Sequence, residues 1–295
     1  MRPTRFGDVM AAISFLIWGL LPLYYQFIPN AAMDEMLAIR LIGSVPFGLL
    51  ILVLVKGRLP DMNTIVADKR SMLYAFGASV MMCVSWSAFT WAITHERVID
   101  ASLGFFISPL TMVALGVLVL KERLSFGKKL GVAFASLGLI YQVVQYGEVP
   151  VIALIMALFF TFYGWLKKKV NYDWATCLFM EALLVAPFAL VYIGFKTATG
   201  ASVALGADTA TFLLYVGSAP MTLLPLVFYS IAIRHTHMSN VGLMQYIEPS
   251  IQFLLAVWLF GEAFDDVKAV SFGLIWFGLL ITIAEVTRQK VARSF

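Results

Sequence analysis

The sequence has few charged residues for its length. Asp, Glu, Lys and Arg make up 13% of the 295 residues, against about 25% in typical soluble domains. Apolar residues make up 61%, and the mean hydropathy is +0.89. This composition excludes a soluble globular enzyme. Because one membrane-spanning helix needs about 20 predominantly apolar residues, the chain has room for roughly ten spans and no folded aqueous domain.

Cysteine and histidine are also scarce. Cys83 and Cys177 fall inside apolar runs, and the three histidines lack metal-ligand spacing, so neither a disulfide framework nor a zinc site is expected. The GxxxxGKS/T phosphate-binding loop, the HExxH metalloprotease motif and the GxSxG nucleophile elbow do not occur in the sequence. We therefore expect no cofactor, no metal, no catalytic residues and no nucleotide-hydrolysing site.

Apolar runs between short polar interruptions predict an all-α polytopic membrane protein with ten transmembrane helices. The first run follows Met1 closely and has no small-residue cleavage signature, so we expect it to remain as a span. Residues 196–209 form the longest loop, whose Gly, Ser and Ala content predicts a flexible surface connection. The predicted spans are 7–27, 36–55, 72–93, 101–120, 128–146, 149–166, 174–195, 210–233, 239–260 and 268–286.

The basic residues predict an orientation rather than a nucleic-acid partner, because they form short clusters between apolar runs and no basic arm. With the N-terminus inside, seventeen Lys and Arg fall in the cytoplasm. Only Arg97, Lys196 and Lys268 fall outside, and Arg40 lies within a span. Since cytoplasmic loops carry the positive excess, both termini are expected in the cytoplasm.

An internal repeat appears when the chain is shifted by 140 residues, which aligns residues 89–140 with 229–280 at twelve identical positions. These include Pro109 with Pro249, Glu122 with Glu262 and Gly138 with Gly278. The interpretation is two five-helix repeats, residues 1–147 and 148–295. Because five is odd, the second repeat enters the membrane inverted, as in many secondary transporters.

Polar side chains in the middle of a membrane mark candidate sites, because they are costly unless they face a cavity or a partner. Gln245, Glu248 and Gln252 share one face of the ninth predicted span. Glu248 lies near the midplane, where desolvation disfavours the charged form, so it could carry a proton during exchange. The alternative is a protonated Glu that bonds to a neighbouring helix.

Prolines occupy matching places in two spans: Pro109 follows Ser108, and Pro249 follows Glu248. Each removes an intrahelical hydrogen bond and frees carbonyls that can line a cavity, although membrane helices also tolerate Pro generally.

Arg40 and Glu181 lie at nearly equivalent places in the two repeats. Each could bind a charged substrate group, but snorkelling or a local ion pair is the more ordinary role.

Aromatic residues within spans could stack on a planar substrate or hold a cation over a ring face. Most aromatics in such a chain are packing or interface residues. Trp18, Tyr163 and Tyr246 are favoured as cavity residues, because their repeat-related positions are also polar or aromatic.

With these features in hand, the chain resembles the EamA family of the drug/metabolite transporter superfamily, in its RarD branch. The segments that carry the resemblance are FLIWG at 15–19, AIR at 38–40, ASLGFFISPL at 101–110, FYG at 162–164 and QYIEP at 245–249. The resemblance implies bacterial inner-membrane permeases with a cavity between two five-helix units. RarD-like proteins bear a label linked to chloramphenicol sensitivity, and related members export amino acids and other small metabolites.

The chain departs from the branch pattern at two positions, with Ser108 in place of Asn and Glu248 in place of Gly. A coupling role for Glu248 would therefore not be general to the family.

The sequence thus predicts a secondary transporter that exports a small metabolite or drug by alternating access. Substrate contacts or coupling are expected at seven residues, while a membrane-embedded enzyme for lipid-linked substrates and a non-transporting scaffold are the alternatives. The expected partners are a small-molecule substrate and the lipid bilayer, with no nucleic acid. The seven residues are Trp18, Arg40, Ser108, Tyr163, Gln245, Tyr246 and Glu248.

Overall fold

A computed structural model describes residues 5–28, 30–95, 97–147, 151–259, 261 and 266–291. All regular secondary structure in these residues is helical. The helices are α1 (Arg5–Tyr25), α2 (Met33–Lys56), α3 (Met62–Ala67), α4 (Lys69–Thr94), α5 (Val98–Leu118), α6 (Phe126–Tyr146), α7 (Val151–Lys169), α8 (Trp174–Ala198), α9 (Thr209–His235), α10 (Met238–Gln245), α11 (Ile247–Trp258) and α12 (Asp266–Val291).

Capping residues set many of the helix ends. Asp61, Asp68, Asp173 and Asp208 each accept hydrogen bonds from backbone N–H groups in the first turn of the helix that follows. An Asp side chain at this position satisfies donors that have no partner within the helix. Local sequence therefore fixes where α3, α4, α8 and α9 begin.

The predicted spans correspond to long helices, with one exception in the ninth. Eight helices of the described chain are long and apolar enough to cross a membrane: α1, α2, α4, residues 101–118 of α5, α7, α8, α9 and residues 266–285 of α12. The fifth predicted span is α6, and the ninth is divided between α10 and α11 at Tyr246. The short helix α3 was not predicted. The polytopic all-α fold is therefore confirmed.

The connection between α8 and α9 differs from the flexible loop that its composition predicts. The Glu35 carboxylate accepts hydrogen bonds from the Ser202 hydroxyl and from the N–H groups of Val203 and Ala204, at 2.8–2.9 Å. Ala204 is fully buried. A buried carboxylate on α2 thus holds this connection in place.

Helix packing has the pseudo-twofold symmetry that an inverted repeat requires. α2 packs on its counterpart α8, and α6 packs on its counterpart α12. The α4–α7 contact has its equivalent in α9–α1, and the α5–α7 contact in α10 and α11 against α1. The two inverted five-helix repeats are therefore interlocked rather than separate.

The α6–α12 contact follows the 140-residue shift in detail. A Cβ atom on Gly131 would lie 3.1 Å from the Gly278 carbonyl oxygen, and one on Gly138 would lie 2.9 Å from the Ser271 carbonyl oxygen. Gly131 is equivalent to Ser271, and Gly138 to Gly278, so the two contacts exchange under the repeat operation. Glu262, the partner of Glu122 in the alignment, lies outside the described residues.

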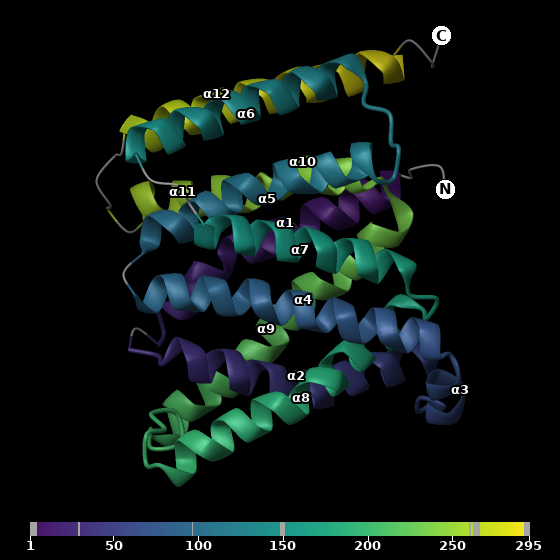
Figure 1. The fold of residues 1–295 in the computed structure, drawn as a ribbon, viewed down its shortest axis with the longest axis vertical. Coiled ribbons are helices and arrows are strands. Elements are labelled where there is room, and N and C mark those ends of the chain that lie inside the picture. The colour runs from purple at the N-terminus through teal and green to yellow at the C-terminus, as the bar shows by residue number, and fades with distance from the viewer. Residues whose placement is uncertain are drawn as a thin grey trace.

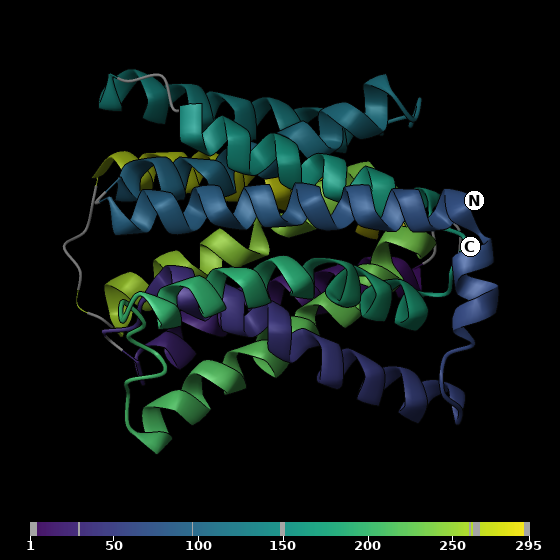
Figure 2. The same ribbon diagram turned by 60° about the horizontal axis from the view of Figure 1, so that its bottom comes forward.

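The long helices run side by side, with α6 and α12 at one edge of the bundle and α2 and α8 at the other (Figure 1). α1 begins and α12 ends at the same end of the bundle, where α3 also lies (Figure 1). The view in Figure 2 shows α3 projecting at this end beyond the layer of long helices. We call this end the α3 end. Of the basic residues counted for the orientation, Arg2 and Arg293 lie outside the described residues.

Candidate functional site: a cavity between the repeats

A cavity of about 370 Å³ lies between the two repeats. Its walls come from α1, α2, α4, α5, α7, α9, α10, α11 and α12. The lining residues include the last turns of α1 and α4 and the first turns of α5 and α12. The cavity therefore lies in the half of the bundle away from the α3 end.

The polar stripe predicted on the ninth span faces this cavity. Gln245, Glu248 and Gln252 all line it. The Gln245 amide Nε2 donates a hydrogen bond to Ser108 Oγ on α5 at 2.9 Å, while its Oε1 has no hydrogen-bond partner within the described chain. The stripe thus presents an acceptor oxygen and a carboxyl group in one wall.

Glu248 is 8% exposed. Among the described residues, no hydrogen bond or ion pair engages its carboxyl group. Helix α11 comes close to α1 at Glu248. A Cβ atom on Gly19 would lie 3.2 Å from the Glu248 carbonyl oxygen and 2.9 Å from Ile251 Cβ. Gly19 therefore allows α1 to pack directly against the segment that carries the carboxyl.

The break between α10 and α11 lies directly beside this carboxyl. Pro249 is the third residue of α11 and has no N–H to bond to the Gln245 carbonyl. Tyr246, at the break, is 1% exposed and its hydroxyl donates to the Phe106 carbonyl at 3.3 Å. Phe106 is the repeat equivalent of Tyr246. Tyr246 therefore packs on the pseudo-twofold axis and is not part of the cavity lining.

Arg40, on α2, also lines the cavity. Its guanidinium carbon lies 4.4 Å from the centroid of the Trp86 ring, and its Nη1 lies 3.4 Å from the Tyr25 hydroxyl. Its Nε has no hydrogen-bond partner, and no carboxylate of the described residues lies within 4 Å of the guanidinium. The local ion pair considered for Arg40 is therefore absent from the described chain.

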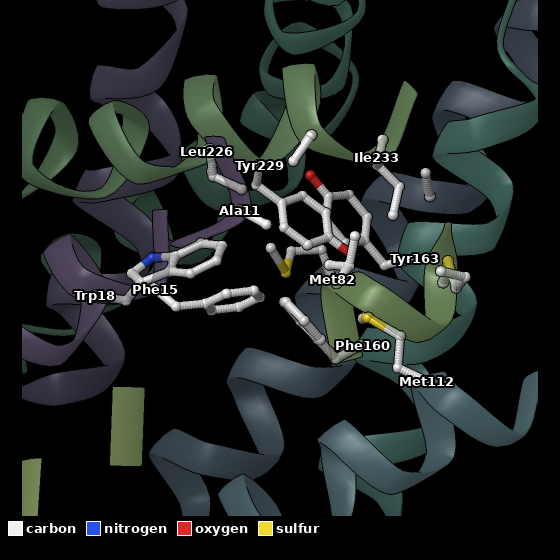
Figure 3. Close-up of a cluster of buried hydrophobic side chains, with 14 of the residues drawn as sticks. Ala11, Phe15, Trp18, Met82, Met112, Phe160, Tyr163, Leu226, Tyr229 and Ile233 are labelled. Carbon is white, nitrogen blue, oxygen red and sulfur yellow. The ribbon is translucent and has the colours of Figure 1, made fainter. Parts of the chain in front are cut away.

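Aromatic side chains close the cavity toward the α3 end. Trp18 and Phe160 belong both to its lining and to a buried cluster that extends below it. Figure 3 shows this cluster, in which side chains from α1, α4, α5, α7 and α9 converge. Tyr163 lies there, stacked on Tyr229 at 5.7 Å between ring centroids. Trp18 thus lies at the floor of the cavity, whereas Tyr163 lies beneath it.

The closed half also contains a buried ion pair. The Lys167 ammonium is fully buried and lies 2.5 and 2.6 Å from the two carboxylate oxygens of Glu181. The Tyr163 hydroxyl donates to the same carboxylate at 3.3 Å. The local pair considered for Glu181 is therefore present. Lys167 escaped the sequence interpretation because it begins a run of three lysines, although its spacing of four from Tyr163 places both on one helix face.

Polar contacts join the two repeats at the α3 end itself. Asp8 on α1 accepts hydrogen bonds from the Thr236 hydroxyl at 2.5 Å and from the Asn240 amide at 2.9 Å. Glu122, after α5, accepts from the N–H groups of Met238 and Ser239 at 2.7 and 2.8 Å. These carboxylates hold the start of α10 against both α1 and the end of α5.

The structure thus places five of the seven predicted residues at one cavity: Trp18, Arg40, Ser108, Gln245 and Glu248. Tyr163 and Tyr246 lie in packed regions next to it. Sequence reasoning missed Trp86 as the partner of Arg40, and Phe160 as part of the floor. In the described residues, no group of three or more His, Cys, Asp or Glu side chains could hold a metal ion.

Comparisons with known proteins agree with this architecture. The profile of the EamA-like transporter family matches residues 5–143. The uncharacterized transporter YojE of Bacillus subtilis is 32% identical over 99% of this chain and 98% of its own length. The protein RarD of Escherichia coli is 31% identical over 99% of both chains.

A solved crystal structure shares the fold, with a TM-score of 0.66 and 16% identity over 93% of this chain and 96% of its own. The described helices include eight that could cross a membrane, and the relatives above cover nearly the whole chain. The chain is therefore a multi-pass membrane transporter that belongs to the EamA family of the drug/metabolite transporter superfamily, in its RarD branch.

Proposed function

We propose that this transporter exports a small metabolite or drug across the bacterial inner membrane by alternating access. The observation that carries the proposal is the cavity between the repeats, which lies in one half of the bundle and is bounded toward the other half by the buried cluster that contains Trp18. A site that is accessible from one side at a time is what two rocking repeats require.

The proposed orientation places the α3 end and both termini in the cytoplasm, because the Lys- and Arg-rich connections lie there. The structure then corresponds to an outward-facing state. In the other state, the contacts of Asp8 and Glu122 with α10 would separate and admit substrate from the cytoplasm. Substrate would contact the aromatic floor and the polar stripe of the ninth span.

Glu248 is the proposed proton carrier. Its carboxyl lies in the cavity wall without a partner among the described residues. A carboxyl in such a place can take up a proton from the outside and release it to the inside when the repeats rock. This exchange would drive export as proton antiport.

The experiment uses purified protein in liposomes that contain a pH-sensitive dye, with a panel of amino acids, aromatic metabolites and chloramphenicol under an imposed proton gradient. We expect at least one compound to produce proton flux. The Glu248→Gln variant should lose that flux down to the level of empty liposomes, while exchange of labelled substrate across the membrane continues.

The matched control is Asp208→Asn, which changes a carboxylate outside the cavity and keeps a side chain that can cap α9. Its proton flux should equal that of the unaltered protein. Flux that is independent of Glu248 would refute the coupling role. If none of the compounds in the panel crosses the membrane, the proposed transport of this class of substrate is refuted.

A further inference from the structure

Arg40 lines the cavity, and no carboxylate of the described residues lies within 4 Å of its guanidinium. A charged side chain within a membrane span is costly and is normally paired or directed into an aqueous cavity. Glu181, at the nearly equivalent place in the second repeat, is paired with Lys167. The two repeats therefore differ at this position: Glu181 is in a buried ion pair, whereas Arg40 lines the cavity without an ion-pair partner among the described residues.

The side chain of Arg40 is held in place by its neighbours. The Trp86 ring packs against one face of the guanidinium at 4.4 Å, and the Tyr25 hydroxyl lies at 3.4 Å from Nη1. These contacts fix the plane of the group but leave most of its five donors without acceptors. A fixed, planar set of donors matches a carboxylate, which accepts two parallel hydrogen bonds.

The rest of the cavity lining is mainly apolar and aromatic. Phe89 and Phe105 line the cavity and contact each other edge to face, at 5.7 Å between centroids. Phe253 and Phe272 line it from α11 and α12, at 4.4 Å between centroids. Such walls suit a flat apolar body.

From this arrangement, we propose that Arg40 binds the carboxylate of the substrate, and that the substrate class is an aromatic or similarly flat monocarboxylate. The proposal rests on the proposed transport function and adds the chemical class of the cargo. Glu248, Lys268 and Tyr25 are the other ionisable residues that line the cavity.

The test measures binding and transport separately. Binding of radiolabelled 3-phenylpropanoate to the purified protein is followed by a scintillation proximity assay, with empty detergent micelles as background. Unlabelled 3-phenylpropanoate, its neutral amide and phenethylamine are the competitors. We expect the carboxylate to compete at least about tenfold more strongly than the amide or the amine, which corresponds to about 1.4 kcal/mol.

Variants at Arg40 identify the group that is responsible. Arg40→Gln should remove the preference for the carboxylate over the amide, and Arg40→Lys should keep part of it, because Lys retains the charge but not the planar set of donors. Arg58→Gln removes an exposed arginine outside the cavity and should leave the preference intact. The melting temperature of each variant, measured as the loss of the monodisperse peak in size-exclusion chromatography after heating, verifies that it is folded.

Three outcomes would overturn the inference: equal competition by the amide, stronger competition by the amine, or a preference that survives in Arg40→Gln. Absence of binding by all three compounds would also overturn it. Binding of the carboxylate without its movement in liposomes would overturn the proposed transport function and leave the carboxylate site standing.

Discussion

Replacing Lys167 by Met tests the buried ion pair between α7 and α8. The Lys167 ammonium bridges both oxygens of Glu181 at 2.5 and 2.6 Å, and neither side chain is more than 9% exposed. Removing the cation leaves Glu181 in an apolar environment with only neutral donors. These are the Tyr163 hydroxyl at 3.3 Å and the Cys177 thiol at 3.2 Å.

The expected magnitude follows from this geometry. Loss of one partner of a buried pair costs about 3–5 kcal/mol, because the remaining charge is left uncompensated. The double variant Lys167→Met, Glu181→Met removes both charges and should lose only about 1 kcal/mol, the approximate value of one neutral hydrogen bond from Tyr163. The double variant should therefore be more stable than the single variant by about 2–4 kcal/mol.

The assay is reversible unfolding by sodium dodecyl sulfate in mixed micelles, which gives a free energy of unfolding for each variant. The control is Lys169→Met on the same helix. Lys169 is exposed and its ammonium lies 3.7 Å from the Trp165 ring centroid, so its loss should cost about 1 kcal/mol or less. A double variant that is as unstable as the single variant would refute the assignment of the cost to an uncompensated charge.

Two further predictions concern the α3 end and the α6–α12 contact. Burial raises the pKa of the Glu122 carboxyl, but hydrogen bonds from the Ser239 backbone and side chain and from the Met238 N–H lower it more, so its pKa lies below the ordinary value. A depressed pKa stabilises the fold above the unfolded pKa of about 4.3 and the benefit is lost as pH falls through the folded value. At pH values below about 4, the melting temperature of the unaltered protein should therefore decrease. The decrease should be smaller in Glu122→Gln, and equal pH dependence of the melting temperature in the two proteins would contradict this. Gly278→Val should lower the melting temperature, because a Cβ there would lie 2.9 Å from a carbonyl oxygen of α6, whereas Gly273→Ala, with no neighbour within 4 Å, should be neutral or stabilising. Equal losses in the two glycine variants would argue against the close approach.

The spans and their repeat could be predicted from the sequence because hydropathy and a 140-residue periodicity are properties of neighbouring residues along the chain. The ninth span shows both the strength and the limit of this reasoning. Its polar stripe at Gln245, Glu248 and Gln252 faces one cavity, as the helical spacing indicates. Pro249 locates the break, because it cannot donate a hydrogen bond to the Gln245 carbonyl, but spacing does not specify that the Tyr246 ring at the break packs against α5.

The candidate site was predicted in part. Helical periodicity assigns a residue to a face of its helix, but it does not say which neighbouring helix covers that face. Tyr163 and Tyr246 were therefore grouped with Trp18, although packing places only Trp18 at the cavity. Lys167 and Glu181 are 14 residues apart on different helices, so their pairing depends on how α7 and α8 are both packed on α4.

The sequence by itself determined that this protein lies in a membrane, crosses it many times and consists of two related halves, because composition and internal similarity need no knowledge of contacts. The tertiary structure decided which half of the bundle contains the cavity, which of two equivalent polar positions is in an ion pair, and which one lines the cavity. Glu181 has its cation beside it, whereas Arg40 faces the cavity. That difference depends on distances between helices, and these are set only when the two repeats pack together.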